Sequence, residues 1–193
     1  MFIPLNSEID LSKSPVFDLW KEAGRMIDVK VEGNSMRPLM RPGDTVSLRL
    51  TDGSEFKTGD LIAYKQDGKL IVHRFLKQRN IDKSLWLCQK GDNLSGWSWI
   101  SEGEALGRVE AIRGRGKQID INTRLWTRIN RVMGISGLLW VSAMEKARLF
   151  KECVAPDRQL PVLGWLVSRA GNVLNSTCGL IIIKAFSAGD RKA

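Results

Sequence analysis

The chain has 193 residues, and its 30 lysines and arginines against 21 aspartates and glutamates give a formal net charge of +9. A hydrophobic content of 43% with seven tryptophans excludes a disordered or collagen-like chain, and the length predicts one domain with at most an appendage. One histidine, His73, and three scattered cysteines without a C-x-x-C pair favour neither a zinc site nor a disulfide framework, so we expect no cofactor, no metal and a reducing compartment.

The first predicted element is a short helix within an N-terminal segment, residues 1–26. Residues 14–26 begin with Ser-Pro and space Val16, Leu19, Trp20 and Ala23 at helical intervals. The start has no basic flank before an apolar run, and no stretch of the chain reaches the roughly 18 apolar residues of a membrane span. We therefore expect a cytoplasmic protein, with peripheral attachment to a membrane left open.

Residues 27–122 are expected to form a β-rich domain of short strands. Apolar and polar residues alternate, or β-formers cluster, between turns rich in Gly and Asp such as RPGD, TDGS, KTGD and QDGK. The predicted strands are 27–33, 44–50, 60–65, 69–77, 84–90 and 107–114.

Residues 123–193 are expected to form a basic helical extension, with eleven basic and four acidic residues. A helix with a possible bend at Gly134 or Gly137 is predicted first, and its apolar face is assigned to Leu125, Ile129, Val132, Leu139, Ala143, Ala147 and Phe150. After a linker with Pro156 and Pro161, residues 162–186 are compatible with a second helix or with a helix and a strand. Packing on the β domain is the simpler interpretation, and docking at an anionic membrane or a partner is the alternative.

Three residues carry candidate chemistry when they are taken together. Ser35 lies in EGNSMRPLMRPGD, His73 in the strand pattern LIVHRF, and Asp92 in the turn KGDN. A serine becomes nucleophilic when a base takes its proton, and histidine is well matched to proton transfer near neutral pH. Asp92 could accept a hydrogen bond from the imidazole and fix its tautomer. Each residue alone is more typical of a turn or of a structural position.

Four segments in this order, EGNSMRPLMRPGD, TGDLIAYK, IVHRF and QKGDN, resemble type I signal peptidases and the related self-cleaving repressor proteases. The resemblance extends over residues 31 to about 112, and the sequence Val72, His73, Arg74 is similar to the histidine-type subfamily. The resemblance implies a mainly β protein with the complex β fold of signal peptidases and repressor proteases. It also implies a helical C-terminal extension of that fold.

The resemblance also implies roles for single residues. Ser35 would be the nucleophile, His73 the general base and Asp92 the nearby acid. Oxyanion or substrate binding falls to the residues around the serine, Gly33, Asn34, Met36 and Pro38. The pairs Gly43–Asp44 and Gly59–Asp60 match structural turns of the family, and Gly91, Asp92 and Asn93 match its GDN box. The chain departs from histidine-type enzymes because no second acidic residue follows GDN before Glu102.

The implied function is that of a serine endopeptidase that cleaves a peptide or precursor protein by a Ser-His mechanism, with the substrate extended beside residues 27–33. One alternative is a catalytically weakened peptide-binding or assembly module on the same fold. A less favoured one is nucleic-acid binding through Arg124, Arg128 and Arg131, because about 26 residues before the first strand are too few for a helix-turn-helix domain.

Trp97 and Trp99 stand at a spacing of two in GWSWI. They are expected to pack on one face of a strand; the other interpretation is an exposed apolar rim. In the second case the pair, together with the basic tail, is a candidate peripheral membrane contact.

Overall fold

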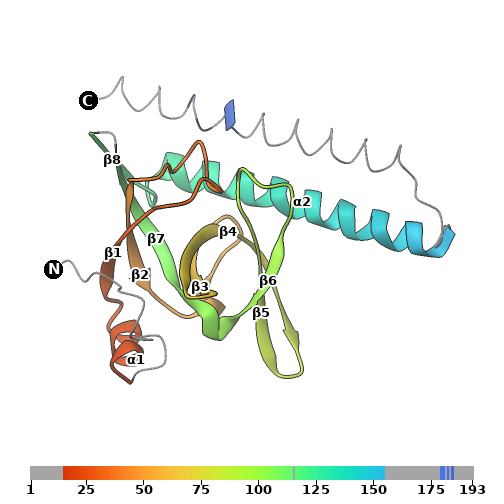
Figure 1. Ribbon diagram of the computed structural model, residues 1–193, viewed down its shortest axis with the longest axis horizontal. Coiled ribbons are helices and arrows are strands. Elements are labelled where there is room, and N and C mark those ends of the chain that lie inside the picture. The colour runs from red at the N-terminus through yellow and green to blue at the C-terminus, as the bar shows by residue number, and fades with distance from the viewer. Residues whose placement is uncertain (1–14, 115, 155–178, 181, 183, 185–193) are drawn as a thin grey trace.

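A computed structural model describes residues 15–114, 116–154, 179, 180, 182 and 184 of the chain. One antiparallel sheet curls upon itself, and a long helix, α2, lies across it (Figure 1). The sheet order is β1-β2-β7-β3-β4-β5-β6, with β8 paired to β7. The elements are α1 (Pro15–Glu22), β1 (Met26–Lys30), β2 (Thr45–Leu50), β3 (Leu61–Gln66), β4 (Lys69–Ile81), β5 (Ser84–Lys90), β6 (Ser98–Ser101), β7 (Ala105–Gly114), β8 (Lys117–Asp120) and α2 (Arg124–Val154), with 3-10 turns at Gly53–Glu55 and Glu102–Glu104.

The mainly β fold, the leading helix and all six predicted strands are confirmed. The first strand is shorter than expected because it ends at Lys30, and residues 31–33 continue without regular structure toward Ser35. Two four-residue strands, β6 and β8, were not predicted as such. No helix of the described residues combines the length and the apolar character needed to cross a membrane.

Two turns with the sequence Gly-Asp repeat one geometry. Gly43 and Gly59 have φ of +91° and +102°, a region that glycine enters without a steric penalty. The carboxylate that follows each glycine accepts a hydrogen bond from a backbone N–H three residues earlier, Arg41 to Asp44 at 2.8 Å and Lys57 to Asp60 at 2.9 Å. These turns begin β2 and β3, and they fix how the chain enters the sheet.

The sheet packs a core on each of its faces. The larger one joins the strands to α2, through Trp126, Ile129 and Met133, and to the segment after Ser35. The smaller one holds the opposite faces of β3, β4 and β5. Alternation along β4 divides the residues between them, with Val72 in the first core and Phe75 in the second.

The buried face of α2 differs from the predicted one. Ile129 is buried, but Leu125, Val132 and Leu139 are 48%, 53% and 66% exposed, so their assignment to the packed face is wrong. The helix packs instead through a face with two glycines and an asparagine, which consists of Trp126, Ile129, Asn130, Met133, Gly134, Gly137 and Val141. The side chain of Phe150 lies outside the residues whose side chains are described.

Gly134 and Gly137 are contact positions on this face. A Cβ atom on Gly134 would stand 2.4 Å from the backbone nitrogen of Gly59, and one on Gly137 would stand 2.9 Å from Cδ2 of Leu76. The glycines therefore allow α2 to approach the 57–60 turn and β4 closely. The secondary structure of α2 continues through both positions from Arg124 to Val154.

Most of the second predicted helix, residues 162–186, lies outside the described residues. Residues 179, 180, 182 and 184 are helical, and Ile182 is fully buried in the core beside α2. Trp99 lies in β6, and Trp97 precedes it; both are half-buried against Leu76, Cys88 and Val141. The tryptophans thus have the packing that their spacing predicted.

Candidate active site

Ser35 lies in a turn between β1 and β2 and is half-buried. The turn is anchored by the three apolar side chains Met36, Leu39 and Met40, which are at most 3% exposed and belong to the core shared with α2. Only four residues separate Ser35 from the end of β1. Because β1 ends the sheet order, its outer edge is a place where an extended peptide could add as a further strand.

The GDN segment, residues 91–93, also contacts the turn that contains Ser35. The backbone N–H of Asn93 donates to the carbonyl of Ser35 at 2.8 Å, and the N–H of Asp92 donates to Sδ of Met36 at 3.4 Å. A Cβ atom on Gly91 would stand 2.9 Å from the same Ser35 carbonyl, so the close approach requires glycine. The two motifs that sequence analysis singled out are therefore in direct contact.

His73 lies on β4 and points into the smaller core. Its Nδ1 is 2.5 Å from Oε1 of Gln89 and 3.0 Å from the hydroxyl oxygen of Tyr64, whose ring meets the imidazole edge-on. Burial lowers the pKa of His73 below its usual value, and the nearby Lys90 acts in the same direction; the hydrogen bond to Gln89 and the charge of Asp92 oppose them. The imidazole is therefore neutral near pH 7.

The contact with Gln89 defines the tautomer of the neutral ring. An amide oxygen can only accept, so Nδ1 carries the hydrogen and Nε2 carries the lone pair. Gln89 is held in turn because its Nε2 donates to the hydroxyl of Ser98 on β6. Every fully buried side-chain nitrogen and oxygen of the described residues has a hydrogen-bond partner. Among these residues Nε2 of His73 has no hydrogen-bond partner, and the residue as a whole is 8% exposed.

Asp92 does not orient His73, which corrects the expectation from the sequence. Its two carboxylate oxygens accept from Nε and Nη2 of Arg74, both at 2.8 Å, in a bidentate ion pair. Arg74 is 2% exposed and also donates from Nη1 to the carbonyl of Gly59 and to Oδ1 of Asn130 on α2. Neighbouring residues of a strand point to opposite faces, so Arg74, and with it Asp92, lies across the sheet from the imidazole.

The remaining predicted residues surround Ser35 without adding a charged group. Gly33 is exposed, and a Cβ there would meet nothing within 4 Å. The carbonyl of Asn34 accepts from the side chain of Asn93 at 3.4 Å, and Pro38 follows a cis peptide bond. Met36, predicted to bind substrate or the oxyanion, has its side chain in the core.

Among the described residues no hydrogen bond joins Ser35 to His73. The structure thus brings the serine turn to the GDN segment, and His73 to Gln89 and Tyr64, as two neighbouring groups linked through Arg74 and Asp92. No group of three or more His, Cys, Asp or Glu side chains in the described part of the chain could hold a metal ion.

Sequence analysis did not single out Gln89, Tyr64 or Asn130. Gln89 follows Leu85 and Leu87 at intervals of two, so it points into the same core as these leucines. Tyr64 has the same relation to Ile62 on β3. A polar residue in phase with a buried apolar face is the signal that would have found both. Asn130 had no such signal, since a buried asparagine on a helix is not visible in a hydrophobic pattern.

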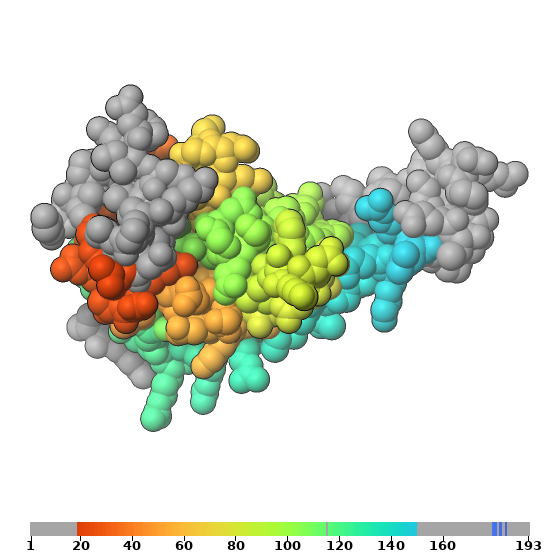
Figure 2. All heavy atoms as spheres, turned by 90° about the horizontal axis from the view of Figure 1, so that it is seen from below, coloured from red at the N-terminus to blue at the C-terminus, as the bar shows by residue number. Residues whose placement is uncertain are grey.

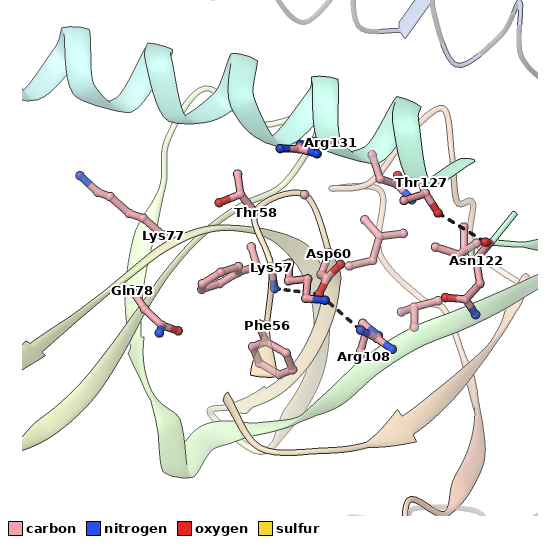
Figure 3. A pocket seen from close by; sticks show the side chains of 16 residues that line it. Phe56, Lys57, Thr58, Asp60, Lys77, Gln78, Arg108, Asn122, Thr127 and Arg131 are labelled. Atoms are coloured by element: carbon pink, nitrogen blue, oxygen red, sulfur yellow. Dashed lines mark hydrogen bonds and ion pairs between the residues drawn. The ribbon is translucent and has the colours of Figure 1, made fainter. Parts of the chain in front are cut away.

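A separate groove of about 780 Å3 opens between the 57–60 turn, β7 and the start of α2 (Figure 3). Asp60 lies inside it, 3.8 Å from the guanidinium of Arg108, and burial raises the pKa of its carboxyl above the usual range. Lys57 and Arg131 also line the groove. None of Ser35, His73 and Asp92 lines this groove, so it is distinct from the candidate active site.

The curled antiparallel sheet with its C-terminal helix is consistent with the fold of S24-like peptidases. Residues 3–88 match the family described as Peptidase S24-like. This match includes Ser35 and His73 and supports the superfamily and a peptidase, that is a hydrolase, at the level of the family. No curated protein was found to match the chain.

Proposed function

We propose that the protein is a serine endopeptidase of the signal-peptidase type, with Ser35 as nucleophile and His73 as general base. The observation that carries the proposal is the surroundings of the imidazole: Nδ1 lies against Oε1 of Gln89, burial lowers the pKa of the ring, and Nε2 has no hydrogen-bond partner among the described residues. A structural histidine has no need of an open lone pair. A general base requires one.

The proposed reaction is the hydrolysis of a peptide bond in two steps. Nε2 of His73 takes the proton of the Ser35 hydroxyl while Oγ bonds to the carbonyl carbon of the substrate. The C–N bond then breaks, and the imidazolium gives its proton to the leaving amine. Water, deprotonated by the same nitrogen, hydrolyses the ester and restores both side chains. Catalytic hydrogen bonds often tighten only in the substrate complex, so we expect the contact between Ser35 and His73 to form there.

The backbone N–H of Ser35 is the proposed oxyanion donor. The contact of the Ser35 carbonyl with Asn93 and the burial of Met36 keep the backbone of this turn in place before the substrate arrives. A donor fixed in advance stabilises the developing charge without a further cost of ordering. The substrate would be a peptide or a precursor protein in extended conformation along the outer edge of β1.

The test is direct sequencing of products. The purified full-length chain is incubated with a library of proteome-derived peptides, and new termini are identified by mass spectrometry. The proposal predicts cuts at a common motif that disappear with Ser35→Ala and with His73→Ala. Cuts that persist in the Ser35→Ala protein would assign the activity to a contaminant.

The alternative is a peptide-binding module with weakened catalysis. It is favoured by two observations, the absence of a carboxylate on His73 and of a hydrogen bond between Ser35 and His73 within the described residues. The same library separates the functions, because this alternative predicts peptides that are retained by the protein and recovered uncut.

A further inference from the structure

The side of α2 that faces away from the sheet is apolar in its middle. Val132, Ile135 and Leu139 are 53%, 44% and 66% exposed, and their spacings of three and four place them in one row along the helix. The packing of α2 on the sheet uses the opposite side, where Met133, Gly134 and Gly137 are buried. We call this row of Val132, Ile135 and Leu139 the outer row.

Basic side chains flank the outer row. Arg124, Arg128 and Arg131 precede it or accompany it, Lys146 follows it, and all four are exposed. Between Arg124 and Leu149 the helix has one acidic residue, Glu145, whose carboxylate is bound to Lys77 on β4 at 2.9 Å. The side chains of α2 project from the body along its lower edge in Figure 2. The charge of this surface is therefore of one sign.

Trp97 and Trp99, the other candidate membrane contact from the sequence, have less free apolar surface than the outer row. Trp97 and Trp99 pack against Leu76, Cys88 and Val141, and the guanidinium of Arg79 lies over the ring of Trp99, 4.0 Å from its centroid. Part of their apolar surface is therefore covered inside the fold. Among the described residues, five of the nine exposed large apolar side chains lie on α2, namely Leu125, Val132, Ile135, Leu139 and Leu149.

We propose that the outward side of α2 binds an anionic lipid surface, with the outer row inserted at the level of the headgroups and the flanking arginines and lysine against the phosphates. An amphipathic helix with an apolar row and a cationic border lies in the plane of such an interface. Each basic residue close to an anionic surface adds to the attraction, and salt weakens it. This role is independent of the proposed peptidase activity.

The test is flotation of the full-length protein with vesicles of phosphatidylcholine alone or mixed with phosphatidylglycerol. We expect binding to the mixed vesicles only, decreasing as NaCl is added. Leu139→Ser should lower the partition coefficient about three- to tenfold, because the apolar side chain that would insert is replaced by a polar one. Arg128→Gln should weaken it about fivefold at low salt and less at high salt.

Leu19→Ser is the matched control, since Leu19 on α1 is 61% exposed and lies away from α2, and it should bind as the unchanged protein does. Thermal unfolding checks that each variant is folded. Absence of binding to the mixed vesicles, equal binding to both kinds, or equal losses with Leu139→Ser and Leu19→Ser would overturn the proposal. A protein that is dimeric in solution and becomes monomeric with Leu139→Ser would show that a second copy covers the outer row, and this too would overturn it.

Discussion

The two faces of β4 hold neighbouring polar residues in different ways. His73 meets only neutral partners, the amide of Gln89 and the hydroxyl of Tyr64, in an apolar core. Arg74, the next residue, is held by the carboxylate of Asp92 and by acceptors on the 57–60 turn and α2. The single acid of the GDN box thus neutralises a structural arginine, and the proposed base keeps a low pKa. An ion pair thus links the sheet to α2 on one face, whereas on the other face the imidazole forms hydrogen bonds with neutral groups only.

The largest expected effect is on the His73 face. Ser35→Ala and His73→Ala should each lower turnover at least about a thousandfold, and the double variant should be no worse than either one, because the two side chains act as a unit. Product formation from the best library peptide measures this. Losses that multiply in the double variant would argue against the pair.

On the Arg74 face the main effect should be on stability. Asp92→Ala removes one partner of a buried ion pair and should lower the free energy of unfolding by about 3–5 kcal/mol, measured by denaturant titration. Asp52→Ala is the control, because Asp52 is bound to Lys21 at the surface with its side chain 63% exposed, and it should cost at most about 1 kcal/mol. An equally mild effect of Asp92→Ala would contradict a structural role for the pair.

The same face depends on the close approach of α2. Gly134→Ala places a methyl group against the backbone of Gly59 and should destabilise the protein by about 1–3 kcal/mol, despite the better helix propensity of alanine. Gly137→Ala meets the flexible end of Leu76 and should cost less. Thermal unfolding of both variants gives the comparison, and a reversed order would show that the helix can move away from the turn without loss.

Gln89→Glu places a carboxylate beside His73, as Asp92 lies beside Arg74 on the other face of β4. Activity should rise with pH as the imidazole loses its proton, with a midpoint below the usual histidine value because burial lowers the pKa of His73. A carboxylate at Nδ1 stabilises the imidazolium, so it should raise this pKa and move the rising limb to higher pH by about one unit. Gln66→Glu, on an exposed position of β3, adds the same charge and should leave the limb in place. If the two variants have the same pH profile, Gln89 does not act on the base.

The sequence predicted the elements better than their contacts. Alternation identified the six longer strands, whereas β6 and β8 have four residues each and too little pattern to separate them from turns. On α2 the large apolar residues suggested the wrong side, because close packing against Gly59 requires the small Gly134 and the arginine contact requires the polar Asn130. A hydrophobic pattern indicates neither the need for a small residue at position 134 nor the need for a polar residue at position 130.

For the site, the motifs located Ser35, His73 and the GDN segment, but not the partner of each. Asp92 follows β5, which pairs with the strand that carries both His73 and Arg74, and only the direction of the side chains on β4 decides between them. Gln89 was within the motif QKGDN, and its phase with Leu87 was the available signal.

The most direct test of the central claim is nitrogen-15 NMR of the imidazole, which is unambiguous because His73 is the only histidine of the chain. The account predicts a neutral ring at pH 7 with the hydrogen on Nδ1 and a pKa below the usual value of about 6.5. The hydrogen on Nε2, or a pKa above that value, would contradict it. In the first case Nε2 would have no lone pair with which to deprotonate Ser35, and in the second case burial would not lower the pKa of the ring as the account requires.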